Sequence, residues 1–129
     1  MSVAGDIVTA LLADVAAAIS GVTTSTEAIA IEQASGFPFA MILQTDYDAE
    51  WIEWGQERRT WTISGTIVQE GGTREDMQTK LEDIQTQIVA DPTLGGSVER
   101  AIFGGSIPQQ HPDAKYIYGI FAVQAEKVV

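Results

Sequence analysis

Four carboxylates in one short window have the spacing that calcium-binding loops use. Asp46, Asp48, Glu50 and Glu57 occupy the first, third, fifth and twelfth positions of an EF-hand-like loop. The sixth position, normally glycine because the chain turns sharply there, is Trp51, and the flanking residues are typical of strands rather than helices. We therefore interpret the acids as the solvent-facing side of a strand end. We predict no dedicated metal site, which leaves adventitious cation binding open.

The single histidine, His111, is a candidate for acid–base catalysis. It lies in the segment 109–113, close to two prolines. A serine mechanism needs a nucleophile, a base and an orienting group within mutual reach, and nothing in the pattern brings Ser97 or Ser106 beside this histidine. We expect an exposed loop histidine.

Two Gly-Gly-Ser sequences, at 95–97 and 104–106, are candidate phosphate-binding loops. Both lack the lysine of a P-loop and neither opens a helix, so we predict turns. The sequence predicts no catalytic site and no cofactor, and we expect a protein that is not an enzyme and that presents surfaces to other subunits. The alternative, an enzyme that works through acidic residues, needs a deep cleft around a carboxylate of strongly raised pKa.

Charge and composition restrict the classes of partner. The chain has 18 Asp and Glu against 7 Lys and Arg, and this net charge of −11 disfavours a sequence-reading nucleic-acid binder. It has no cysteine, which excludes disulfides and thiol chemistry. The length predicts a single domain over 1–129. The apolar start at 7–19 contains an acid and is too short to span a bilayer, so we expect no membrane partner.

The first half of the chain predicts one helix followed by strands. Residues 7–19 place their apolar side chains on one helical stripe, and the Ser- and Thr-rich segment 20–26 is typical of a loop. Period-two apolar residues predict strands at 28–33 and 39–43. From residue 59 the alternation is strict, and one face of that strand carries Trp61, Ile63, Gly65 and Ile67.

A second helix is predicted between Thr73 and Asp91. Thr73 and Asp76 resemble a capping box, and the helix ends at Asp91 because a residue before proline is driven out of the α region. The apolar stripe of this helix comprises Met77, Leu81, Ile84 and Ile88. Its outer face is acidic and comprises Glu75, Asp76, Glu82 and Asp83.

Strands at 98–103 and 116–125 complete the pattern, joined by a loop rich in glycine and proline. The last strand is apolar on both faces, so we expect it to be central or to be covered by a partner. The fold class is α+β: a mainly antiparallel sheet of four to six strands with two helices, one packed on a sheet face, and a protruding hairpin. The opposite face, which carries Tyr116 and Tyr118, is expected to remain available.

The predicted hairpin is the candidate interface. Its first arm runs through Trp51 and Trp54, its tip is at 55–56, and Arg58 and Arg59 follow. Tryptophan and arginine are enriched at the centres of protein interfaces. For the two tryptophans both core and interface positions remain open, whereas the period of the following strand assigns Trp61 to the core. Such a hairpin suits heterologous, ring-forming contacts.

Several segments, taken in order, resemble the tail terminator proteins of long-tailed bacteriophages. They are Pro38–Leu43, Arg59–Ile67, the second helix, its Asp-Pro-Thr-Leu-Gly-Gly exit at Asp91–Val98, and the tyrosine-rich closing strand Tyr116–Val123. The resemblance covers nearly the whole chain in order and size.

The resemblance implies a structural protein without catalytic activity. Such a protein caps the completed tail tube as a ring, a hexamer in this family, and offers its other side to the head connector. It is assembled in the host cytoplasm and stays in the virion at the head-proximal end of the tail. DNA passes through the ring without sequence-specific binding, and the acidic face of the second helix is compatible with such a lumen. The alternatives are another connector (neck) component and a small ligand- or peptide-binding module that uses the tyrosine-bearing sheet face.

Overall fold

The computed structural model describes residues 3–30, 33–110 and 115–129, with only the backbone described for 105–110. His111 lies outside the described residues. The helices and strands follow one another as α1 (Val3–Ala18), β1 (Thr23–Ser25), β2 (Phe39–Trp51), β3 (Glu57–Glu70), α2 (Arg74–Ala90), β4 (Arg100–Gln110) and β5 (Tyr116–Val128).

The strands form one five-stranded sheet in the order β1-β2-β3-β5-β4. The short strand β1 pairs in parallel with β2, and all other pairings are antiparallel. The α+β prediction is therefore confirmed, with a mixed sheet. Strand β5 lies between β3 and β4, in the central position that its two apolar faces predicted.

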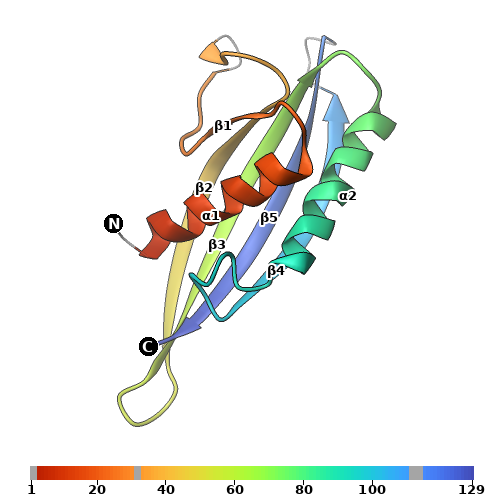
Figure 1. Ribbon diagram of the computed structural model, residues 1–129. Helices are drawn as coiled ribbons and strands as arrows, with labels where there is room; N and C mark the ends of the chain where they lie inside the picture. The colour runs from red at the N-terminus through yellow and green to blue at the C-terminus, as the bar shows by residue number, and fades with distance from the viewer. Residues whose placement is uncertain (1–2, 31–32, 111–114) are drawn as a thin grey trace.

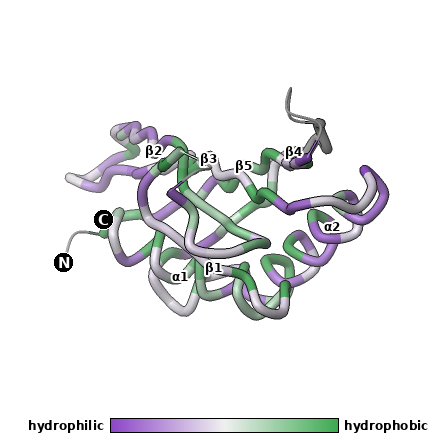
Figure 2. The backbone as a smooth tube through the Cα atoms, turned by 90° about the horizontal axis from the view of Figure 1, so that it is seen from above, coloured by the Kyte–Doolittle hydropathy of each residue, from purple (hydrophilic) through white to green (hydrophobic). Residues whose placement is uncertain are grey.

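Both helices lie on the same face of the sheet, so the molecule has two layers and its other sheet face, here called the bare face, carries no helix (Figures 1 and 2). The apolar stripe of α1, including Ile7, Leu11 and Val15, is fully buried, as the spacing predicted. The stripe of α2 is buried with it, and both pack on the inward side chains of β3 and β5. Within the described residues, neither helix is both long enough and apolar enough to cross a membrane.

The ends of α2 are those that the sequence predicted. The hydroxyl of Thr73 accepts a hydrogen bond from the Asp76 backbone N–H at 3.1 Å, and the Asp76 carboxylate accepts one from the Thr73 N–H at 2.9 Å. This capping box satisfies two of the N–H groups that open a helix without intrahelical partners. Asp91, before Pro92, is the C-terminal cap.

Close packing of α2 on the sheet depends on Gly119, near the start of β5. A Cβ atom at this position would lie 2.8 Å from Leu81 Cδ1, which is closer than real Cβ contacts come. The absent side chain lets the fully buried Leu81 settle onto the sheet.

The prediction for 20–33 was wrong. None of the described residues in 28–33 is in a strand, and β1 lies instead at Thr23–Ser25, inside the predicted loop. The Thr23 N–H donates to the Pro38 carbonyl at 3.0 Å and continues into the parallel pairing with β2. The Ile29 N–H points to Met41 Sδ at 3.3 Å instead of entering a ladder. Pairing partners, not the local apolar period, decide where this strand forms.

Strands β2 and β4 are both longer than predicted. β2 continues from the predicted end at 43 to Trp51, and β4 continues from 103 to Gln110. Gly104 was predicted to lie in a turn but is part of β4, where the register with β5 shifts between Gly104 and Ser106. Because β4 is an edge strand, it tolerates a glycine bulge and a proline that a central strand would not.

Candidate functional site

The predicted protruding hairpin is confirmed. The distal part of β2 and the start of β3 extend beyond both helices (Figure 1), and every residue from 43 to 56 is exposed. The two arms stay in register from Tyr47 opposite Trp61 to Trp51 opposite Glu57, so the hairpin is regular to its tip.

The tip is a tight turn that contains a tryptophan in an unusual backbone conformation. The Gln56 N–H donates to the Glu53 carbonyl at 2.9 Å, and the two residues between them have positive φ, 53° at Trp54 and 77° at Gly55. This is the φ pattern of a type I′ hairpin turn, whose favoured pair is Asn-Gly. A bulky aromatic side chain in the left-handed region is an outlier, because its Cβ crowds the following carbonyl.

The tip is also the most exposed apolar group on the described surface. Trp54 is 92% exposed, Trp51 71% and Ile52 41%. Of the two positions left open for Trp51 and Trp54, the core is therefore wrong and both side chains are available for contacts outside the chain. Trp61 is buried as predicted, with its ring centroid 5.5 Å from that of Tyr47.

The two arginines of the hairpin project to opposite faces of the sheet. Arg59 Nε lies 2.7 Å from Glu57 Oε1, and the hydrogen bond to this carboxylate raises the pKa of Arg59 above its usual value. Arg58 is exposed on the bare face of the sheet and lies directly across the ladder from Glu50. Arg59 is thus held in position by a neighbour, whereas Arg58 reaches into solvent.

The carboxylates with EF-hand spacing do not converge. Asp46, Asp48 and Glu50 occupy alternate positions of β2 and lie about 7 Å apart along one face of the sheet. Glu57 sits on β3, projects to the opposite face and contacts Arg59. No group of three or more His, Asp or Glu side chains suited to a metal ion occurs among the described residues.

The tyrosines lie at the other end of the sheet from the hairpin. Tyr116 pairs across the ladder with Glu70, and its ring centroid is 5.2 Å from that of Phe37. Tyr118 lies two residues further along the same face. The twelve residue steps of β3 from Arg58 to Glu70 separate the tyrosines from the hairpin by about 40 Å. The predicted interface residues therefore form two separate surfaces.

The acidic face of α2 is exposed, but it is neither uniform nor wholly free. Its four predicted acids, Glu75, Asp76, Glu82 and Asp83, all face solvent. Asp76 serves as a capping residue, and Lys80 lies one helical turn from both Asp76 and Asp83. Its orientation toward a lumen stays a prediction.

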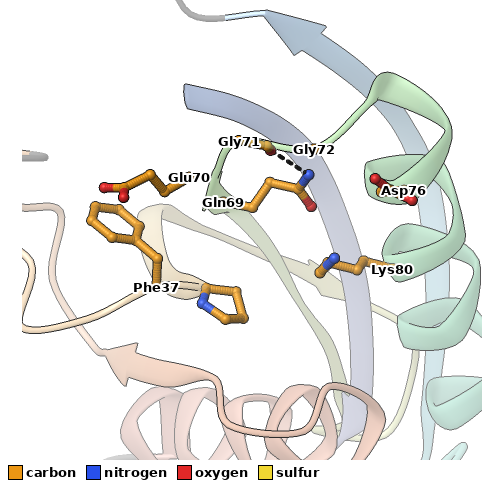
Figure 3. Close-up of a pocket in the computed structure, with 8 residues that line it drawn as sticks. Phe37, Gln69, Glu70, Gly71, Gly72, Asp76 and Lys80 are labelled. Carbon is orange, nitrogen blue, oxygen red and sulfur yellow. Dashed lines mark hydrogen bonds between the residues drawn. The ribbon is translucent and has the colours of Figure 1, made fainter. Parts of the chain in front are cut away.

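A cleft that the sequence did not reveal lies beside the turn between β3 and α2 (Figure 3). Its volume is about 530 Å³, and its lining residues are Phe37, Pro38, Gln69, Glu70, Gly71, Gly72, Asp76 and Lys80. Gln69 is only 6% exposed; its Nε2 donates to the Gly71 carbonyl at 2.9 Å, and its Oε1 has no hydrogen-bond partner within the part of the chain that the structure describes. The sequence did contain a signal for Gln69: the alternate positions of β3 whose side chains face the helices continue past Ile67 to this polar residue.

A second group that the sequence did not reveal is Asp14, on the apolar side of α1. It is 8% exposed, and burial, followed by the neighbouring Asp91 carboxylate, raises its pKa to about 7. Asp14 lies three residues after Leu11, a spacing that puts both side chains on the same side of a helix, and this was the signal in the sequence. Asp14 does not line the cleft, so its raised pKa does not create the acidic active site considered above.

The geometry defines a two-layer α+β domain whose distinguishing features are surfaces: an aromatic hairpin, a bare sheet face and a polar cleft. No family model and no curated protein matches the chain. Among solved structures, it is similar to a chain of the virion of a native gene transfer agent (GTA) particle. The TM-score is 0.59 at 10% sequence identity, and the match covers 97% of this chain and 96% of that chain. The two chains therefore share the whole fold.

Proposed function

We propose that this chain is a structural component of a phage-type virion and, within it, the tail terminator. The observation that carries the proposal is the likeness, over almost the full length of both chains, to a chain of a gene transfer agent virion. The resemblance of its segments to tail terminators narrows that class to the protein that caps the tail tube and provides the attachment surface for the head connector.

The surfaces of the molecule support such a role. Assembly into a ring requires two different patches per subunit, because heterologous contacts close a circle when the rotation between subunits allows it. The hairpin with Trp54 at its tip and the surface around Tyr116 are two such patches, about 40 Å apart. The proposed partners are copies of this chain in a hexamer, the tube protein and the connector protein, and the role needs neither catalysis nor a cofactor.

Charge also fits a ring through which DNA passes. The net charge of −11 and the exposed acids of α2 repel phosphate, so a lumen lined by them would let the genome slide without binding. The proposed location is the head-proximal end of the tail in the virion, after assembly in the host cytoplasm.

The test is deletion of the gene from the genome that produces the particle, followed by electron microscopy of the products. A tail terminator predicts overlong tails that do not join heads. Tails of normal length that fail to join would instead assign the chain to the neck. Normal, joined particles would falsify both roles.

A further inference from the structure

We propose that the cleft between the end of β3 and α2 binds the hairpin tip of a second copy, with Trp54 seated in the cleft and Glu53 paired with Lys80. The inference rests on the proposed function in taking the chain to assemble with itself. It pairs an exposed aromatic tip with a cleft at the far end of the same strand.

The cleft has one apolar wall and one polar wall. Phe37 and Pro38 form the apolar wall, and Gln69 and Lys80 face them from β3 and α2 (Figure 3). A flat aromatic group with a polar edge matches such a site, because its ring contacts the apolar wall while its edge meets the polar wall.

The polar wall lacks one hydrogen-bond donor. The Nε2 atom of Gln69 is fixed by the Gly71 carbonyl, so the side chain is oriented, and its Oε1 lies buried beneath the cleft surface without a hydrogen-bond partner among the described residues. Buried acceptors are normally paired, and an unpaired one indicates a missing partner. The indole N–H is a donor only, so a tryptophan supplies what Gln69 lacks without adding an unpaired acceptor.

The cleft also offers a positive charge. Lys80 points its ammonium group into the cleft (Figure 3) and makes no ion pair with the residues that the structure describes. The two acids of the lining are engaged elsewhere, Glu70 with Lys115 at 3.6 Å and Asp76 with the Thr73 N–H at 2.9 Å, so Lys80 is the group that a carboxylate next to the incoming tryptophan would pair with. Glu53 directly precedes Trp54, so the tip carries both groups that the cleft accepts.

The tip is prepared for insertion. Trp54 is 92% exposed at the end of a two-stranded arm, and the tight turn presents it with a backbone φ of 53°, in the left-handed region. Backbone outliers of this kind cluster at binding sites, where the constraint presents a side chain. A rigid turn also loses little conformational freedom on binding.

The tip and the cleft cannot meet within one molecule. They lie at opposite ends of β3, about 40 Å apart, with the sheet between them. The contact therefore joins the tip of one copy to the cleft of the next. Such a heterologous contact continues from copy to copy until it closes as a ring or grows as a filament.

The first experiment is a charge swap in the full chain, followed by sedimentation velocity over a range of concentrations. E53K and K80E are each expected to raise the dissociation constant of self-association about tenfold, and the double variant E53K/K80E to restore it. W54A is expected to raise it about 30-fold or more. The matched control is V89A, which trims an exposed apolar residue on α2 outside the cleft.

The second experiment uses the absence of native cysteine. E53C and K80C chains are purified separately, mixed and oxidised, and the expected product is a disulfide-linked pair containing one of each. E99C, which moves the thiol to another exposed glutamate, is mixed with K80C as the control and should give no such product.

Two results would overturn the docking proposal: a chain that remains monomeric throughout, or oligomers whose affinity W54A and the charge swap leave unchanged. Neither result bears on particle morphology after gene deletion. Conversely, if the deletion strain produced normal particles while E53C and K80C still formed the specific disulfide, the proposed tail function would be wrong and the docking contact would stand.

Discussion

The helix-covered body and the hairpin are built on the same two strands, β2 and β3, yet they expose their apolar residues very differently. In the body, Ile63 and Ile67 are fully buried, whereas at the tip Trp51 and Trp54 are 71% and 92% exposed. Full burial of one such side chain stabilises a fold by about 1.5 to 3 kcal/mol. The body therefore carries the stability of the chain, and the largest apolar residues of the hairpin remain available for partners.

The sharpest contrast is expected from removing one large side chain from each region. Phe121 is 1% exposed, and its ring is stacked 6.4 Å from that of Phe103. F121A should lower the free energy of unfolding by about 3 to 5 kcal/mol in urea titration, because it leaves a cavity. W54A should change it by less than about 0.5 kcal/mol. Equal losses in the two variants would contradict the division between body and hairpin.

The stability of the body should also depend on pH, through one buried carboxyl group. The pKa of Asp14 is raised from 3.8 to about 7, so its contribution to stability is fully present below the unfolded-state pKa and is lost as the pH rises through about 7. D14N should be more stable than the native chain at pH 8 by about 2 to 4 kcal/mol, and similar to it near pH 4. Urea unfolding at both pH values measures this, with the exposed D83N as control. Parallel pH profiles of D14N and the native chain would contradict it.

Packing between the layers should be sensitive to a single methyl group. G119A places a Cβ atom 2.8 Å from Leu81 Cδ1, and we expect thermal unfolding to show a loss of about 1 to 3 kcal/mol from overpacking. At Gly104 the nearest atom to an added Cβ is 3.8 Å away, so G104A is the matched control with a smaller loss. If the two alanines cost the same, close approach is not what Gly119 provides.

The smallest expected effect is a gain in stability rather than a loss. W54N places the preferred Asn-Gly pair in the type I′ turn and relieves the left-handed tryptophan, so it should stabilise the monomer by about 0.5 to 1 kcal/mol. Urea unfolding checks the value. A destabilised W54N would mean that Trp54 supports the fold and is not kept for a partner.

Much of the body could be predicted from the sequence, because local and tertiary preferences agree there. Three patterns each permit only one structural interpretation: the capping box at Thr73, the apolar stripe through Leu81 and the strict alternation from Trp61. The structure confirms all three. The hairpin was predicted as well, although the exposure of Trp51 and Trp54 was left open, since aromatic residues suit cores and interfaces equally.

The parts of the fold and of the site that were not predicted depend on residues that are distant in sequence. Strand β1 forms because Thr23 pairs in parallel with Phe39 of β2, and β4 continues through Gly104 because an edge strand accepts a bulge. Gln69 and Asp14 are polar residues at inward positions of apolar series. A pattern of apolar positions does not show that each of these two side chains is buried with one oxygen atom that has no partner among the described residues.

The most direct test of the account is complementation of the deletion strain with a variant that separates stability from assembly. W54N, which is expected to be at least as stable as the native chain, should fail to restore joined particles in electron micrographs. G104A, a change outside both the tip and the cleft, should restore them. Full restoration by W54N, in a protein shown to be folded, would contradict the claim that the hairpin tip performs the assembly function.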